Sequence, residues 1–212
     1  MKHLSGGVFI TMEGTDGAGK STQVKLLRDF LVEQGWDVVV TREPGGTYVG
    51  EKIREILVDC ASGELTPLTE LFLYLAGRHQ HTQQLIKPAL EAGKVVICDR
   101  YADSSLVYQG FGRGIPQAVV EELNRLATEG ITPDITFLFL LPWREGQRRL
   151  KRYDRLESAG DAFFRRVEEG YKRLAKLYPD RILTVDATLC IEDIHRMIRD
   201  AVVKLLDVKR RT

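Results

Sequence analysis

The chain has 212 residues, of which 43% are hydrophobic and 29% charged, and its 31 Lys and Arg are balanced by 30 Asp and Glu. This composition excludes disordered, collagen-like and low-complexity chains, and the absence of a linker predicts one domain over residues 1–212. The balanced charge gives no reason to expect nucleic-acid binding, no apolar run reaches the length of a membrane span, and three widely spaced cysteines favour a cytoplasmic protein.

Short apolar runs alternate with helical patterns along the chain. Five strands are expected at residues 8–12, 38–41, 95–98, 135–140 and 182–185. Helical patterns are expected near residues 24–32, 53–57, 69–92, 119–126, 163–177 and 191–206. Strands that are apolar at successive positions are buried on both faces, and their alternation with helices implies parallel crossovers. The fold class predicted is therefore α/β, a three-layer sandwich with a five-stranded parallel sheet flanked by helices.

A glycine-rich loop joins the first strand to the first helix. Residues 14–21, GTDGAGKS, match G-x-x-x-x-G-K-[ST], the P-loop pattern. Backbone N–H groups and the helix N-terminus of such a loop surround phosphate oxygens. We expect Lys20 to reach the β- and γ-phosphates of a nucleotide and Ser21 to ligate Mg²⁺.

Two charged residues, Asp99 and Arg100, follow the third strand. Carboxyl ends of parallel strands form the ligand crevice, so Asp99 is placed to hold Mg²⁺ through water. A guanidinium binds phosphate in a bidentate manner, so Arg100 suits an acceptor monophosphate. The alternatives are a strand-end cap for Asp99 and a structural ion pair for Arg100. The chain has no Asn-Lys-x-Asp motif, the usual guanine reader of GTPases.

Four motifs in chain order resemble those of bacterial thymidylate kinases. They are residues 13–22 (EGTDGAGKST), 41–47 (TREPGGT), 99–110 (DRYADSSLVYQG) and 154–157 (DRLE). The resemblance covers nearly the whole chain. It implies a nucleoside monophosphate kinase fold of the P-loop type, ATP with Mg²⁺ as the phosphoryl donor, dTMP as the acceptor, and a homodimer with no nucleic-acid or membrane partner. The ATP-binding residues it implies are Gly14, Thr15, Asp16, Gly17, Ala18, Gly19, Lys20, Ser21 and Thr22.

The resemblance also assigns an acceptor pocket. Asp16 is expected near the sugar 3′-hydroxyl or the magnesium shell, Arg42 at the acceptor phosphate and Pro44 beside the thymine methyl. Ser105 is expected at the edge of the base. Tyr108 and Gln109 are expected to pack beside the sugar and base.

One helix is expected to supply the contacts to the base. Tyr74 would stack on the base and Arg78 would donate to its carbonyl, since residues four apart share a helix face. Many relatives carry Phe at the stacking position. Phe72 is the competing aromatic, and packing in the core is the alternative for both rings. The residues expected to bind dTMP are Asp16, Arg42, Pro44, Tyr74, Arg78, Arg100, Ser104, Ser105, Tyr108 and Gln109.

A short basic segment after the fourth strand, residues 143–158, is expected to form a lid. In a helix, Arg148, Arg152 and Arg155 would share a face and clamp the transferring phosphoryl group. Gly17 occupies the P-loop position where some relatives carry a catalytic arginine, so the resemblance points to the lid. We favour Arg148 or Arg152, then Arg155, and a solvated basic face is the alternative. The predicted catalytic residues are Lys20, Arg100, Arg148, Arg152 and Asp16.

Two other functions remain open from the sequence. Tyr74 and Ser105 leave room for another pyrimidine nucleoside monophosphate kinase. The short lid leaves room for a P-loop protein that binds nucleotides without catalysis. His79 and His81 are two residues apart and are expected at the surface rather than in a metal site.

Overall fold

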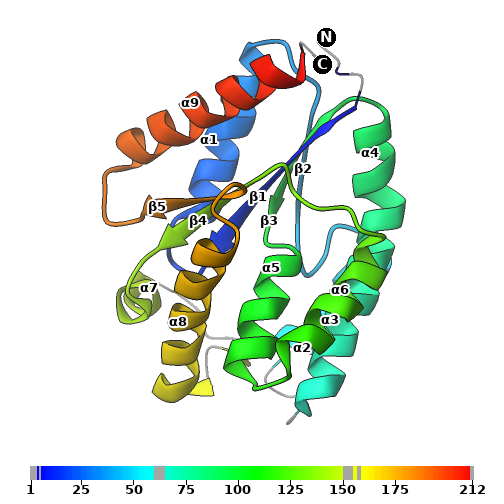
Figure 1. Cartoon of the computed structure of the whole chain (residues 1–212), viewed down its shortest axis with the longest axis vertical. Helices are drawn as coiled ribbons and strands as arrows, with labels where there is room; N and C mark the ends of the chain where they lie inside the picture. The colour runs from blue at the N-terminus through cyan, green and yellow to red at the C-terminus, as the bar shows by residue number, and fades with distance from the viewer. Residues whose placement is uncertain (1–3, 5, 60–64, 150–154, 157–158, 211–212) are drawn as a thin grey trace.

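The computed structural model describes residues 4, 6–59, 65–149, 155–156 and 159–210, and its centre is a five-stranded parallel sheet (Figure 1). The strand order is β2-β3-β1-β4-β5, with all four pairings parallel. The predicted α/β sheet is therefore confirmed, with each expected strand found within two residues of its predicted ends. The strands are β1 (Val8–Gly14), β2 (Val38–Arg42), β3 (Val95–Asp99), β4 (Ile135–Leu140) and β5 (Ile182–Asp186).

The register brings the ends of three strands together. Asp99 at the end of β3 pairs with Met12 of β1 on one side and with Arg42 of β2 on the other. Burial on both faces holds for the central strands but not for the edges. Val40 of β2 is 42% exposed and Leu183 of β5 is 36% exposed, because each edge strand has a neighbour on one side only.

Helices cover both faces of the sheet (Figure 1). The predicted helix over residues 69–92 is interrupted by a wider π-helical turn. Pro88 follows this turn, and a proline interrupts regular helical hydrogen bonding because it has no N–H group. Residues 102–112 are also helical, although the sequence pattern predicts no helix there. The helical elements are α1 (Lys20–Glu33), α2 (Tyr48–Val58), α3 (Pro67–His81), η2 (Thr82–Ile86), α4 (Lys87–Glu91), α5 (Ala102–Ser105), η3 (Leu106–Gly112), α6 (Gln117–Thr128), α7 (Trp143–Arg149), α8 (Asp161–Leu177) and α9 (Ile191–Lys209).

Alternate side chains of β1 enter two different cores. Ile10 and Met12 pack in a cluster with side chains of α1 and α9, whereas Phe9 packs on the opposite face with Ile86 and Tyr101. These two clusters confirm the three layers. In the part of the chain that the structure describes, no helix is long and apolar enough to cross a membrane.

Candidate active site

The loop between β1 and α1 is shaped to surround an anion. Gly19, with a left-handed backbone (φ 90°), is the residue at which the loop leads into α1. Because the helix begins there, the positive end of its dipole faces the loop. Lys20 folds back on the same loop, where its Nζ donates to the carbonyls of Gly14 (3.1 Å) and Thr15 (2.9 Å). Burial lowers the pKa of Lys20, and the charge of Arg100 lowers it further. A bound polyphosphate would supply this buried ammonium with anionic partners.

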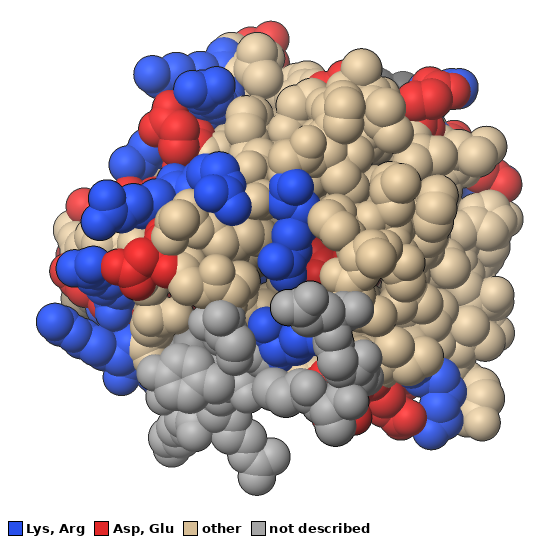
Figure 2. Space-filling view, turned by 90° about the horizontal axis from the view of Figure 1, so that it is seen from below, with Lys and Arg blue, Asp and Glu red and all other residues tan. Residues whose placement is uncertain are grey.

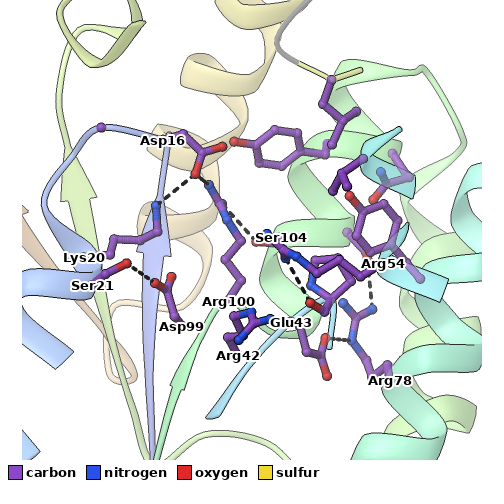
Figure 3. A pocket seen from close by; sticks show the side chains of 18 of the residues that line it. Asp16, Lys20, Ser21, Arg42, Glu43, Arg54, Arg78, Asp99, Arg100 and Ser104 are labelled. Atoms are coloured by element: carbon purple, nitrogen blue, oxygen red, sulfur yellow. Dashed lines mark hydrogen bonds and ion pairs between the residues drawn. The ribbon is translucent and has the colours of Figure 1, made fainter. Parts of the chain in front are cut away.

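Oxygen ligands suited to a divalent cation lie beside this loop. The Ser21 hydroxyl donates to Oδ2 of Asp99 at 2.8 Å, and both residues line the same cavity (Figure 3). Hydroxyl and carboxylate oxygens are what Mg²⁺ prefers, and Mg²⁺ is commonly bound by one or two protein groups together with substrate phosphates. The donor set therefore fits the magnesium expected at Ser21 and Asp99.

Arg100 joins the phosphate loop to the loop after β3. Its backbone is left-handed (φ 72°), and its Nη2 donates to Oδ1 of Asp16 at 2.6 Å (Figure 3). Burial alone would raise the pKa of Asp16, but the charges of Arg100 and Lys20 outweigh it and hold this pKa well below its usual range. The Asp16 side chain is 44% exposed and lines the cavity, so it remains accessible to a ligand.

A cavity of about 530 Å³ extends from the phosphate loop to the C-terminal half of α3. Every residue expected to bind dTMP lines it, together with Gly17, Gly19, Lys20, Ser21 and Thr22 of the loop. Gly14, Thr15 and Ala18 are not among the lining residues described. Seen toward this edge of the sheet, Lys and Arg side chains gather in the middle and on the left of the surface (Figure 2).

Arg78 is the most restrained of the expected base contacts. Its side chain is 1% exposed, and Nε donates to Oε2 of Glu43 at 2.8 Å. Its Nη1 donates to Ser105 Oγ (2.8 Å) and Asn124 Oδ1 (2.7 Å), and its Nη2 donates to the carbonyl of Tyr101 (3.0 Å). Four protein acceptors thus fix the guanidinium at the cavity wall.

The carboxylate of Glu43 has a second partner that the sequence analysis missed. His81 is fully buried, with Nδ1 3.1 Å from Oε1 of Glu43 and Nε2 2.7 Å from Oγ1 of Thr41. The expectation that His81 lies at the surface is therefore wrong, whereas His79 is exposed as expected. His81 lies three residues after Arg78 on α3, so both side chains reach the buried carboxylate of Glu43.

The remaining acceptor residues form the other walls. Arg42 and Arg54 lie at the cavity (Figure 3). Arg42 donates to the Glu51 carboxylate at 2.8 Å, and Arg54 donates to the carbonyl of Pro44 at 3.0 Å. The Glu43–Pro44 peptide bond is cis. The Tyr108 hydroxyl is buried, and the guanidinium carbon of Arg100 lies 5.3 Å from the centre of the Tyr108 ring.

The basic segment divides into residues of different placement. Arg149 of α7 lines the cavity and donates to the carbonyl of Gly17 at 3.4 Å, whereas Arg148 is exposed and is not among the described lining residues. Arg152 lies outside the described residues, as do Asp154 and Glu157. Arg155 pairs with the buried Glu70 at 2.8 Å and donates to the carbonyl of Leu57 at 3.0 Å.

Several residues at the site escaped the sequence reasoning. Glu13 and Glu43 lie within two of the four motifs, each next to a residue that was assigned a role. Glu13 is a carboxylate in an otherwise apolar strand, and this unusual position could have marked it as a functional residue. No pattern marked Arg54, which reaches the cavity from α2, or Glu70, which lies buried beside Arg155. Arg149 lies in the basic segment expected to form the lid, but no role was assigned to it.

Comparison with known proteins gives one consistent result. Residues 12–198 match the family model described as thymidylate kinase. The chain is 47% identical over 203 residues to a thymidylate kinase of an Exiguobacterium strain, AT1b, covering 94% of this chain and 96% of the relative. It is also 47% identical over 206 residues to a thymidylate kinase of Pelotomaculum thermopropionicum, covering 95% of each chain. A crystal structure of thymidylate kinase from Ehrlichia chaffeensis superposes with a TM-score of 0.76 at 36% identity, covering 95% of this chain and 99% of that one.

Proposed function

This chain belongs to the thymidylate kinase family, and on that premise we propose how its residues transfer a phosphoryl group from ATP to dTMP. The chain is an enzyme of nucleotide biosynthesis that phosphorylates dTMP to dTDP with ATP as the donor. The observation that carries the assignment of roles is the Asp16–Arg100 pair, which joins the phosphate loop to a cavity lined by all the expected acceptor residues.

The donor side consists of the phosphate loop and the end of β3. Residues 14–22 surround the phosphates of ATP, and Lys20 neutralises the β- and γ-phosphates. Ser21 and Asp99 would hold Mg²⁺, Asp99 through water. When bound, this ion shields the negative charge of the donor phosphates.

The acceptor side holds dTMP for in-line attack. Arg100 and Arg42 bind its phosphate, whose oxygen forms a bond to the γ-phosphorus of ATP as the bond to the β-phosphate oxygen breaks. No general base is needed, because the attacking oxygen is already anionic. Tyr74 stacks on the base, and Arg78 presents its remaining N–H group to the base carbonyl.

The rest of the pocket shapes the acceptor. Pro44 contacts the thymine methyl, Ser105 lies at the base edge, and Ser104 supports Arg100. Tyr108 and Gln109 pack beside the sugar and base, and Asp16 lies beside the sugar hydroxyl.

An arginine of the lid, residues 143–158, stabilises charge during transfer. The candidates from sequence are Arg148 and Arg152, then Arg155, and the position of Arg149 on the cavity wall adds another. Because Arg155 pairs with the buried Glu70, Arg148, Arg149 and Arg152 are tested first. Replacing each by Ala should single out one residue whose loss lowers kcat by about 10³-fold with an unchanged melting temperature. Equal, small effects at all three would contradict these assignments.

An ADP-release assay with ATP and Mg²⁺ tests the acceptor assignment. We expect turnover with dTMP to exceed that with dUMP, dCMP or AMP, because Pro44 and Ser105 surround the methyl edge of the base. A preference for another monophosphate would overturn the roles assigned to the residues of the base pocket, but not the kinase activity. Equal ADP release without any acceptor would show hydrolysis of ATP by water and overturn the proposed transfer to dTMP.

We further propose that the chain works as one kinase domain and as a homodimer in the cytoplasm, where ATP and dTMP are available. The dimer rests on apolar side chains that α2, α3 and α6 leave exposed. They are Val49, Ile56, Leu68, Phe72, Val119 and Leu126, each at least 42% exposed.

A further inference from the structure

A buried carboxylate lies directly behind the acceptor-binding arginine. Glu13 is 1% exposed, one residue before the phosphate loop. Its Oε2 accepts hydrogen bonds from the hydroxyls of Ser104 (2.6 Å) and Tyr171 (3.0 Å). Its Oε1 accepts from the backbone N–H of Tyr101 at 2.8 Å. Glu13 therefore ties β1, the start of α5 and helix α8 to one point.

The direction of these hydrogen bonds matters for Arg100. A hydroxyl has one proton, so when Ser104 and Tyr171 both donate to Glu13, their oxygens can only accept from other groups. Nη1 of Arg100 lies 3.4 Å from the Ser104 oxygen and 3.3 Å from the Tyr171 oxygen, as a donor to both (Figure 3 draws the Ser104 contact). The opposite end of the guanidinium donates to Asp16.

We propose that Glu13 is a positioning residue for the acceptor phosphate: its carboxylate fixes the two hydroxyls as acceptors and through them aims Arg100. Glu13 does not line the cavity and acts through Arg100. The inference rests on the proposed role of Arg100 in binding the phosphate of dTMP. Protonated Glu13 would need an acceptor for its own proton, so it would no longer hold both hydroxyls as acceptors for Arg100.

The surroundings of Glu13 bring its protonation close to neutral pH. Burial raises the pKa of Glu13, and the charge of Asp103 raises it further. The charge of Arg100 and the hydrogen bonds from Ser104 and Tyr101 lower it, and the resulting pKa is about 7. At lower pH the neutral form releases Arg100, so acceptor binding strengthens as the pH rises through this range. The titratable groups that face Glu13 from the neighbouring elements are Lys20, Cys98, Arg100, Asp103, Tyr108, Tyr171 and Arg181.

Glu13→Gln, which mimics the neutral acid at every pH, tests the proposal. We expect KM for dTMP to rise about tenfold, as for one lost charge-assisted contact, while KM for ATP stays within about twofold. The ratio of kcat/KM for dTMP, wild type over variant, should grow as the pH increases through about 7. The second ionisation of dTMP affects both enzymes equally and cancels in this ratio. An unchanged KM for dTMP, or a ratio that is flat with pH, overturns the proposal.

Tyr171→Phe gives a second test if Glu13→Gln folds poorly. This variant keeps the ring and removes one acceptor for Arg100, so KM for dTMP should rise severalfold. Tyr178→Phe, at the end of the same helix, is the matched control and should leave both KM values unchanged. A Tyr171→Phe enzyme with wild-type KM for dTMP overturns the proposal.

Arg100→Lys separates this inference from the assignment beneath it. If that variant binds dTMP normally, the role of Arg100 fails and the inference fails with it. If Arg100→Lys is defective while Glu13→Gln and Tyr171→Phe are normal, the inference about Glu13 alone is wrong.

Discussion

Two aromatic residues on α3 compete for the base, and the structure separates them. Tyr74 lines the cavity, whereas Phe72 is 54% exposed and is not among the described lining residues. We expect Tyr74→Ala to raise KM for dTMP about tenfold or more, since stacking on a base contributes about 1–3 kcal/mol. Tyr74→Phe should stay within about threefold of wild type, because the ring is kept. Steady-state kinetics with varied dTMP measures both.

Phe72→Ala is the matched control for this test. Its KM for dTMP should equal that of wild type, because Phe72 lies outside the cavity. A larger effect from Phe72→Ala than from Tyr74→Ala would reverse the assignment of the stacking residue.

The buried Glu13 also predicts a pH-dependent stability. Burial first, and then Asp103, raise its pKa from 4.5 to about 7 in the folded protein. Between these values the folded state binds the proton more than the unfolded state does, so this residue makes the free energy of unfolding fall as the pH rises. Gln does not titrate. The free energy of unfolding of Glu13→Gln minus that of wild type should therefore increase by up to about 3 kcal/mol from acidic pH to pH 8.

Urea unfolding at several pH values measures this difference. A difference that is constant across the range would show that Glu13 has an ordinary pKa in the folded protein. The expected result also implies that the enzyme retains an ionised Glu13 at a cost in stability.

The sequence predicted residues whose roles follow from a local motif. Lys20, Ser21 and Asp99 lie where the P-loop pattern and the strand end place them, because both depend on short-range geometry. The restraint of Arg78 by Glu43, Ser105 and Asn124 was not predictable, since those partners come from three other segments of the chain.

At the scale of elements, α7 packs against the phosphate loop backbone to backbone. A Cβ atom on Gly146 would overlap the carbonyl oxygen of Asp16, and one on Gly17 would overlap that of Gly146. Gly146→Ala should therefore displace α7 and lower kcat/KM for ATP at least about tenfold, because small misplacements of reacting groups are costly. Initial rates at varied ATP measure the effect.

Gly77→Ala supplies the matched control within another helix. A Cβ there would lie 3.7 Å from Ile53, an ordinary contact, so kcat/KM for ATP should not change. The free energy of unfolding should rise by about 0.5–1 kcal/mol, as expected when Ala replaces Gly inside a helix. Equal kinetic effects of both substitutions would contradict a specific contact between α7 and the loop.

A second contact between elements gives Arg155 a structural role. Glu70 is fully buried and accepts hydrogen bonds from Gln109 (2.8 Å) and Arg113 (2.9 Å) besides its pair with Arg155. Burial opposes ionisation of Glu70, but its bonds with Arg113 and Gln109 outweigh this and lower its pKa. Arg155→Ala should lower the free energy of unfolding by about 1–3 kcal/mol while kcat stays within about tenfold of wild type.

Arg144→Ala is the comparison for stability, since the pair of Arg144 with Asp161 is exposed and such pairs contribute about 0–1 kcal/mol. If Arg155→Ala lowers kcat about 10³-fold with unchanged stability, Arg155 would instead be the catalytic arginine of the lid.

Hydrophobic periodicity in the sequence predicted the strands and the regular helices, but it missed two segments of irregular helix. Short apolar runs marked all five strands, although the edge strands β2 and β5 are only partly buried. The wide turn η2 precedes Pro88, a local signal that hydrophobic periodicity does not include, and no periodic pattern marked the helical turns of residues 102–112.

For the whole molecule, the sequence predicted the fold and also which motifs meet at one edge of the sheet. Motifs at the ends of β1, β2 and β3 converge because these strands are parallel and adjacent, with Asp99 in register with Met12 and Arg42. The strand order was not predictable from the sequence, since it depends on which strands each helical connection passes over.

Self-association is the property of the whole molecule that the exposed apolar face of α2, α3 and α6 predicts. A monomer rarely leaves such a group of side chains in water, and a symmetric dimer would cover it on both chains. Light scattering should therefore give twice the chain mass of 24.0 kDa. Phe72→Glu should shift the protein to the monomer, because each carboxylate would be buried in the interface. Met197→Glu, at an equally apolar exposed position on α9, should remain dimeric, whereas a wild-type monomer at all concentrations would refute this interface.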